Sequence, residues 1–247
     1  MSAGRSRAVT GNETAVSAAE FELSASRLGS LGARLLGAAL VLLGVLVGIG
    51  QLLTHWLRTS ALTRWDASVD RWFVQRRTPD WNAVTKAMTF GAETETVIAI
   101  GLVCFVVLRW RLGRWRESLF LAVSLIGEVS IFLGTTLLVE RHRPGVPRLD
   151  SAPPTSSFPS GHTAAAVTLY GGLALIAWAA ARAGWLRLLA TALAVLMPAA
   201  VGLSRLYRGM HNPTDVLAGA LLGVCWLAVA RTLVLRSVLR PDPWQAR

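Results

Sequence analysis

The chain has 247 residues, of which 53% are hydrophobic and only 16% are charged, and its formal net charge is +11. Its mean hydropathy of +0.48 excludes a soluble globular protein, so the composition predicts an all-α, polytopic membrane helix bundle. We expect anionic lipid and not nucleic acid as the partner of the positive charge, because the arginines flank hydrophobic segments instead of lining one soluble face.

Residues 1–32 are rich in Ser, Ala, Gly and Arg and lack a long apolar run. This composition predicts a disordered cytoplasmic tail and not a cleaved signal peptide. We expect a six-helix membrane domain over 33–237 and a second cytoplasmic tail over 238–247. Since about 20 apolar residues cross a bilayer, the predicted spans are Leu35–Thr54, Thr89–Leu108, Ser118–Val139, Thr163–Ala181, Leu188–Leu203 and Val216–Val234.

Two features mark the region between the first spans. The segment from Asp66 to Lys86 interleaves aromatic residues with charges, which predicts one interfacial amphipathic helix on the outer surface. The second span reaches full length only by including Glu93 and Glu95, so we expect these glutamates at an interface or covered by protein.

Arginine placement predicts the orientation in the cell (plasma) membrane, because short positive loops stay on the cytoplasmic side. The turns after the second and fourth spans carry several arginines: Arg109, Arg111, Arg114, Arg116, Arg182 and Arg187. We therefore expect both termini on the cytoplasmic side and the loops after the third and fifth spans on the outer face.

The segment Phe158-Pro159-Ser160-Gly161-His162 ends a polar loop and opens the fourth span. Ser160 suits a helix N-cap, Gly161 lets a ligand approach the backbone, and the free amides of a helix start favour an anion. Taken alone, this segment is better explained by an ordinary helix cap with His162 as an interfacial residue.

A similar helix start follows the fifth span, where Ser204-Arg205 precedes His211 and Asp215. His211 and Asp215 are four residues apart, so in a helical turn the carboxylate can reach the imidazole and fix its tautomer. Alone, this segment is also explained by a well-formed helix start, with Asn212 as the cap and Pro213 at the first helical position.

Two arginines beside these segments, Arg143 in Arg143-Pro144 and Arg205, suit the neutralisation of phosphate oxygens. The alternative is anchoring to lipid headgroups. That alternative is our main interpretation of Arg141, Arg148 and Arg208.

Three segments in chain order carry these residues: Arg143-Pro144, Phe158 to His162, and Ser204 to Asp215. Their order and spacing resemble the three-motif signature of the type 2 phosphatidic acid phosphatase superfamily, from Arg143 to Asp215. The second and third motifs are complete. The first lacks its lysine: the family has a lysine, six further residues and then Arg-Pro, and Thr136 stands at the position of that lysine. This gap is where we expect the protein to differ from its relatives.

The resemblance implies a mechanism. His211 would attack phosphorus to give a phosphohistidine, His162 would protonate the leaving oxygen and then activate water, and Asp215 would support His211. The phosphate oxygens would be held by Arg143, Ser160, the amide of Gly161 and Arg205, with Arg141 as a substitute for the missing lysine.

The implied substrate is a lipid phosphate in the membrane: phosphatidic acid, phosphatidylglycerophosphate or polyprenyl diphosphate. We expect no metal or cofactor, because the four histidines lack metal-ligand spacing and acidic clusters are absent. Two alternatives stay open: a lipid phosphotransferase that uses the same histidine chemistry, and a non-catalytic lipid-binding membrane protein, which the loss of the lysine makes conceivable.

Some features lie outside the motifs. Cys104 and Cys225 fall in apolar spans, so no disulfide is expected. The pairs Gly44-x-x-x-Gly48 and Gly219-x-x-x-Gly223 permit close helix contact, within the bundle or between copies in a homo-oligomer. Glu128, in the middle of the third span, is interpreted either as a protonated acid bonded to a neighbour such as Ser124 or as part of a transport path.

Overall fold

The computed structural model describes residues 7–113, 115–152 and 154–236, and within these ranges it contains helices and no strand. The all-α prediction is therefore confirmed. The helices are α1 (Arg7–Gln51), α2 (Ala61–Val74), α3 (Pro79–Phe90), α4 (Thr94–Leu112), α5 (Arg116–Leu138), α6 (Gly161–Ala180), α7 (Gly184–Tyr207) and α8 (Pro213–Ala230), with π-helical turns at Leu52–Trp56 and Arg231–Arg236. The chain divides into two compact units, Met1–Ala38 and Ala39–Arg247, and the second unit contains the end of α1 together with α2 to α8.

Among the described residues, five helices are long and apolar enough to cross a membrane: Leu28–Trp56, Arg116–Leu138, Gly161–Ala180, Gly184–Tyr207 and Pro213–Leu235. A sixth span results if α3 and α4, which meet at a bend of 42°, are counted as one broken span. The predicted number of about six spans agrees with this upper count.

The first helix extends far beyond the predicted span. It begins at Arg7, so residues 7–32 are helical where a disordered tail was expected. No proline interrupts residues 7–51, and alanine and leucine, which favour helix, are frequent there. The expected tail over 238–247 and the first six residues lie outside the described part of the chain.

The predicted single interfacial helix is wrong in one respect, because it is two helices, α2 and α3. They separate at Thr78-Pro79, where proline disfavours helical geometry in the preceding residue. The Thr78 hydroxyl accepts a hydrogen bond from the Trp81 amide at 3.2 Å and so caps α3. In α2 the tryptophans face outward, with Trp65 47% and Trp72 48% exposed.

The second span also starts later than predicted. Glu93 occupies the N-cap position of α4 and Glu95 lies in its first turn. Carboxylates are favourable at a helix start because of the helix dipole. The two glutamates therefore stand at the start of α4, next to the bend between α3 and α4.

Helix α6 is the most buried of the spans, with 50% of its apolar window covered. Helix α8 packs closely against it because Gly219 and Gly223 lack side chains. A Cβ atom at Gly219 would overlap the carbonyl oxygen of Ser160, and one at Gly223 would lie 2.7 Å from Val167. No described atom outside α1 itself lies within 4 Å of the Cβ positions of Gly44 and Gly48. The pair Gly219 and Gly223 therefore serves packing within the bundle.

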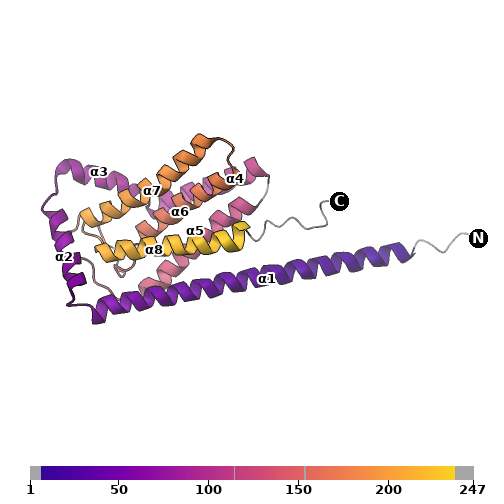
Figure 1. The fold of residues 1–247 in the computed structure, drawn as a ribbon, viewed down its shortest axis with the longest axis horizontal. Helices are drawn as coiled ribbons and strands as arrows, with labels where there is room; N and C mark the ends of the chain where they lie inside the picture. Colours follow the sequence, from indigo (N-terminus) through magenta and orange to yellow (C-terminus); the bar gives the residue numbers. More distant parts are fainter. Residues whose placement is uncertain (1–6, 114, 153, 237–247) are drawn as a thin grey trace, which may run out of the picture. The chain divides into compact units, whose positions relative to one another are not determined.

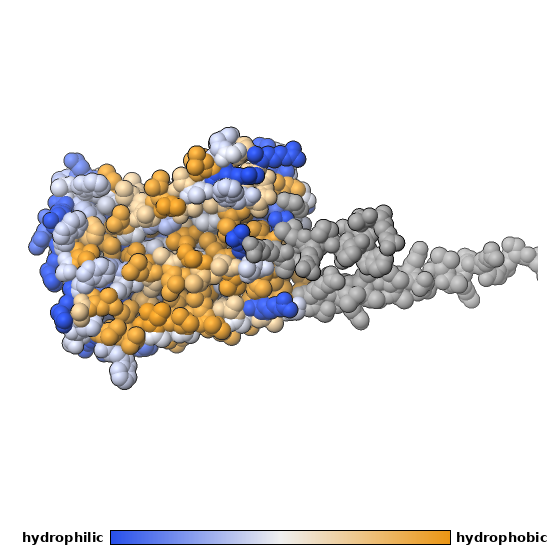
Figure 2. Space-filling view, in the orientation of Figure 1, coloured by the Kyte–Doolittle hydropathy of each residue, from blue (hydrophilic) through white to orange (hydrophobic). Residues whose placement is uncertain are grey.

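Figure 2 shows apolar side chains gathered over the middle of the visible face of the bundle, with hydrophilic residues concentrated over α2 and α3 and again at the opposite end. This distribution is typical of a protein that crosses a bilayer.

The segments that carry the sequence motifs meet at one end of the bundle, next to α2 and α3 (Figure 1). The amide of Ser160, before α6, donates to the carbonyl of Asp215, in the first turn of α8, at 2.9 Å. The starts of α6 and α8 are therefore held side by side.

Candidate active site

A cavity of about 470 Å³ lies between α4, α5, the start of α6 and the end of α7. Arg143, Gly161, His162, Arg205 and His211 all contribute to its lining. The structure thus brings five of the predicted site residues together around one space. Ser160, Asp215 and Arg141 are buried but do not line it.

The end of α7 positions Arg205 and His211. The amide of Met210 donates to the Arg205 carbonyl at 3.0 Å and that of Gly209 to the Leu206 carbonyl at 3.0 Å, which is a Schellman motif. Gly209 has a φ of 70°, the left-handed conformation that this motif requires and that favours glycine. Arg205 therefore lies in the last turn of α7, and His211 follows directly after the chain reversal.

The imidazole of His211 is oriented by a backbone carbonyl. Its Nδ1 lies 2.7 Å from the carbonyl oxygen of Ser157, and since that oxygen only accepts, Nδ1 must carry the proton. The lone pair is then on Nε2. Burial, followed by the positive charges of Arg205 and Arg143, lowers the pKa of His211 well below its usual value. His211 is therefore neutral, the state in which a histidine can act as a nucleophile.

Asp215 does not form the hydrogen bond to His211 that the sequence predicted, because its Oδ2 lies 3.9 Å from Nδ1. The carboxylate instead accepts from the backbone amide of Asn212 at 2.9 Å and from Arg141 Nη1 at 2.5 Å. Asp215 is engaged in capping its own helix, and the Ser157 carbonyl takes the place expected for it. Spacing alone could not reveal this carbonyl, since any loop residue can supply one.

Arg143 and Arg205 each retain an unused donor. Arg143 donates from Nη1 to the Met210 carbonyl at 2.9 Å, and Arg205 from Nη1 to Asp150 Oδ2 at 3.3 Å. The Nε atoms of both arginines are buried and have no hydrogen-bond partner among the described residues. Because buried donors without a partner are costly, two such guanidinium groups at one cavity indicate a site for an anion.

Asp150 is a site residue that the sequence analysis missed. It accepts from Arg208 Nε at 2.6 Å and Nη2 at 2.5 Å, in addition to its contact with Arg205. Burial alone would raise the pKa of Asp150, but the hydrogen bond and charge of Arg208 bring it below the usual value. Arg208 is 4% exposed, so it is not the headgroup anchor predicted for it. The available signal was an acid in a loop that carries several arginines.

Arg141 is placed outside the cavity, so it does not replace the missing lysine. Its guanidinium joins Asp215 to Asp66 of α2, with Nη2 2.8 Å from Asp66 Oδ2. Asp66 also accepts from the Thr214 amide at 3.1 Å and the Thr214 hydroxyl at 2.6 Å. Arg141 and Asp66 therefore tie α2 to the start of α8. The signal for Asp66 was its spacing from Asp70, which puts two acids on one face of α2.

Ser160 occupies the N-cap position of α6, as predicted, but its hydroxyl pairs with the hydroxyl of Thr163 at 2.9 Å and caps no amide. A Cβ atom at Gly161 would lie 2.7 Å from the ring of Phe132, so this glycine is needed for the contact with α5. Thr136 lines the cavity, and its hydroxyl donates to the Leu133 carbonyl at 2.9 Å. The position of the missing lysine thus faces the site but supplies no charge.

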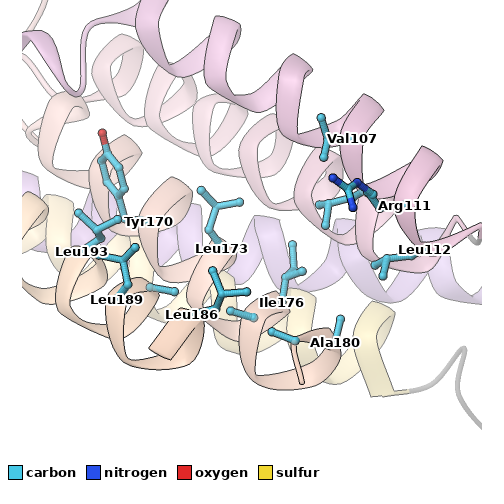
Figure 3. Close-up of a pocket in the computed structure, with 14 residues that line it drawn as sticks. Val107, Arg111, Leu112, Tyr170, Leu173, Ile176, Ala180, Leu186, Leu189 and Leu193 are labelled. Carbon is cyan, nitrogen blue, oxygen red and sulfur yellow. The ribbon is translucent and has the colours of Figure 1, made fainter. Parts of the chain in front are cut away.

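A second cavity, of about 380 Å³, lies between α4, α6 and α7 and is drawn in Figure 3. Leucines such as Leu173, Leu186 and Leu193 point into it, with Arg111 at one end and Tyr170 at the other. Its lining holds no histidine, cysteine or carboxylate. It offers space for apolar chains and no group for phosphate chemistry.

The PAP2 superfamily model matches residues 71–238, which include α3 to α8 and the whole cavity. The chain belongs to the PAP2 superfamily. This PAP2 chain is 31% identical over 131 residues to the bacitracin transport permease protein BcrC of Bacillus licheniformis, an alignment that covers 51% of the chain and 60% of that relative. The chain therefore matches less than two thirds of BcrC.

A solved structure has the same fold. The transmembrane PAP2-type phosphatidylglycerolphosphate phosphatase from Bacillus subtilis superposes with a TM-score of 0.69 at 20% identity, covering 82% of this chain and 96% of that one. The described helices thus form a transmembrane PAP2 fold.

Proposed function

We propose that this protein is an integral membrane phosphatase that hydrolyses the phosphomonoester or diphosphate of a lipid. The observation that carries the proposal is the meeting, at one cavity, of a neutral histidine with a free Nε2 and two buried guanidinium groups with unused donors. Phosphoryl transfer depends on positioning and on neutralising charge on the non-bridging oxygens, and these groups supply both. Membership of the PAP2 superfamily and the phosphatase with the same fold support the same class of substrate.

In the first step, Nε2 of His211 attacks phosphorus while the bond to the leaving oxygen breaks and its electron pair stays with that oxygen. His162, in the same lining, protonates the leaving oxygen. The positive charge that forms on His211 is stabilised through Nδ1–H by the Ser157 carbonyl, 2.7 Å away, and by the carboxylate of Asp215 at 3.9 Å.

In the second step, neutral His162 removes a proton from water, and the oxygen attacks phosphorus as the N–P bond breaks. The bond electrons return to His211, and inorganic phosphate leaves. Arg143 and Arg205 contact the phosphate oxygens throughout, and Gly161 lets the substrate approach the start of α6, where free amides favour an anion. No metal ion takes part in either step.

The lipid tails would lie beside α4 and α5. Several apolar residues at the cavity are exposed on the surface of the bundle, including Ile98 at 55%, Ile126 at 65% and Leu133 at 51%. A lipid can therefore enter from the bilayer with its phosphate at the end of the bundle that carries the motifs. We place this end on the outer face of the membrane, with both termini cytoplasmic.

The test is phosphate release by the purified full chain in detergent, with phosphatidic acid, phosphatidylglycerophosphate and polyprenyl diphosphate in turn, and with EDTA present. We expect phosphate release from at least one lipid and inhibition of this release by vanadate. In His211→Ala the rate should fall at least about a thousandfold, since removing the nucleophile has one of the largest effects that a single substitution can have on a catalytic rate. Substitution of exposed His142 by alanine is the matched control and should leave the rate unchanged. Full activity of His211→Ala, or complete loss of wild-type activity in EDTA, would overturn the mechanism.

A further inference from the structure

Glu128 lies in the middle of α5, is 4% exposed, and lines the same cavity as His162 and His211. The Ser124 hydroxyl, expected as its partner, donates to the Phe120 carbonyl instead. Among the described residues the carboxyl group of Glu128 has no hydrogen bond or ion pair. Because an acid inside a membrane span is costly, one without a protein partner at a binding cavity is a candidate ligand contact.

The position of Glu128 relative to the phosphate site follows from the helix. Phe132, one turn further along α5, contacts Gly161 at the start of α6. With a rise of 1.5 Å per residue, Glu128 lies about 6 Å deeper in the bilayer than Phe132. Its α5 neighbours in the lining are Leu125, Ile126 and Val129, so this part of the cavity is otherwise apolar.

The candidate lipids differ at this depth. When the phosphate of a glycerolipid contacts Arg143 and Arg205, its glycerol and ester oxygens follow within a few bonds and reach the level of Glu128. A polyprenyl diphosphate instead continues with its second, negatively charged phosphate and then with hydrocarbon, so it carries no glycerol hydroxyl or ester carbonyl oxygen. A protonated carboxyl can donate one hydrogen bond and accept others, which suits a carbonyl or hydroxyl oxygen.

We infer that Glu128 is a specificity-determining residue that binds an oxygen of the glycerol backbone or its esters, and so favours glycerolipid phosphates over polyprenyl diphosphates. This inference rests on the proposed phosphatase function. A transport role is not needed to explain Glu128, because binding of a substrate oxygen in the cavity accounts for a buried acid at this position.

The experiment compares steady-state kinetics of the full chain on dioleoyl phosphatidic acid, its dialkyl ether analogue and geranylgeranyl diphosphate. Glu128→Leu removes the polar group, and Glu128→Gln keeps a hydrogen-bond donor. Ser130→Ala is the matched control, because the exposed Ser130 hydroxyl donates only to the Ile126 carbonyl of its own helix. Thermal unfolding in detergent verifies that each variant is folded.

We expect Glu128→Leu to raise KM for phosphatidic acid roughly three- to tenfold, the effect of one lost hydrogen bond, and to leave KM for geranylgeranyl diphosphate unchanged. Glu128→Gln and Ser130→Ala should behave like the wild type. A smaller effect on the ether analogue assigns the contact to an ester carbonyl, and an equal effect assigns it to another glycerol oxygen.

An unchanged KM for phosphatidic acid in Glu128→Leu, or the same rise for both classes of lipid, would overturn the inference while leaving the phosphatase intact. A wild-type protein that releases no phosphate from any of these lipids would instead refute the proposed function. The two failures are therefore distinguishable.

Discussion

Asp70 lies one helical turn after Asp66 on the buried face of α2 and is 2% exposed. Burial, and then the negative charges of Asp66 and Asp215, raise the pKa of Asp70 to about 7, although Arg141 and Arg71 act in the opposite direction. Its Oδ1 is buried and has no hydrogen-bond partner among the described residues. One arginine, Arg141, thus faces a third acid in addition to the two that it binds.

A raised pKa in the folded state means that folding takes up a proton, so this group costs stability as pH rises from its unfolded value near 4 to its folded value near 7. We predict that Asp70→Asn raises the unfolding temperature, with a gain that grows between about pH 4 and pH 7 and then levels off. Thermal unfolding in detergent at several pH values measures it. Asp80→Asn, at an exposed position in α3, is the control, and a gain that is independent of pH would contradict the assignment.

At the scale of single residues, the sequence predicted the groups that line the cavity better than their partners. His162, His211, Arg143 and Arg205 were predicted from motif spacing, and the structure brings them together. The pairing of these groups with their partners was not predictable, although the acids themselves could have been noticed, because the partners come from distant parts of the chain. Asp66, which binds Arg141, is the clearest case.

At the scale of helices, the close packing of α8 against α6 fixes the position of the residues at the start of α6. Gly219 leaves no room for a side chain, because a Cβ atom would overlap the Ser160 carbonyl. Ser160 directly precedes Gly161 and His162, so a shift of α8 would move the histidine as well.

We predict that Gly219→Ala destabilises the bundle by about 1–3 kcal/mol, the usual cost of overpacking, and lowers phosphatase activity. Gly44→Ala is the matched control, because a Cβ atom there meets nothing within 4 Å outside its own helix. Alanine is the better helix former, so this variant should be unchanged or slightly stabilised. Equal unfolding temperatures for the two variants would contradict the predicted packing.

Helix ends were predicted less well than helix cores, for local reasons. The apolar run Leu188–Leu203 identified α7, but the helix extends from Gly184 to Tyr207, where the chain reversal at Gly209 ends it. The break at Thr78-Pro79 could have been predicted from the proline alone. The length of α1 could not, because its first turns combine good and poor helix formers.

At the scale of the whole molecule, the proposed orientation can be tested by labelling. Ser151, in the loop at the cavity end, and Gly184, the first residue of α7, are both exposed. We predict that Ser151→Cys reacts with a membrane-impermeant maleimide in intact cells and that Gly184→Cys reacts only after permeabilisation. The wild type, with Cys104 and Cys225 in apolar helices, is the background control. The reverse pattern would place the cavity on the cytoplasmic face.

The exposed apolar wall of the cavity, formed in part by Ile98 and Ile126, has a consequence for kinetics if it faces lipid as proposed. If the substrate enters laterally from the bilayer, the protein binds substrate that diffuses within the membrane. Its rate should then follow the mole fraction of substrate in the bilayer or micelle instead of the bulk concentration. The products then separate by phase: the dephosphorylated lipid diffuses back into the membrane, while phosphate leaves to water. Diluting the substrate with inert lipid at constant total substrate should therefore slow the reaction.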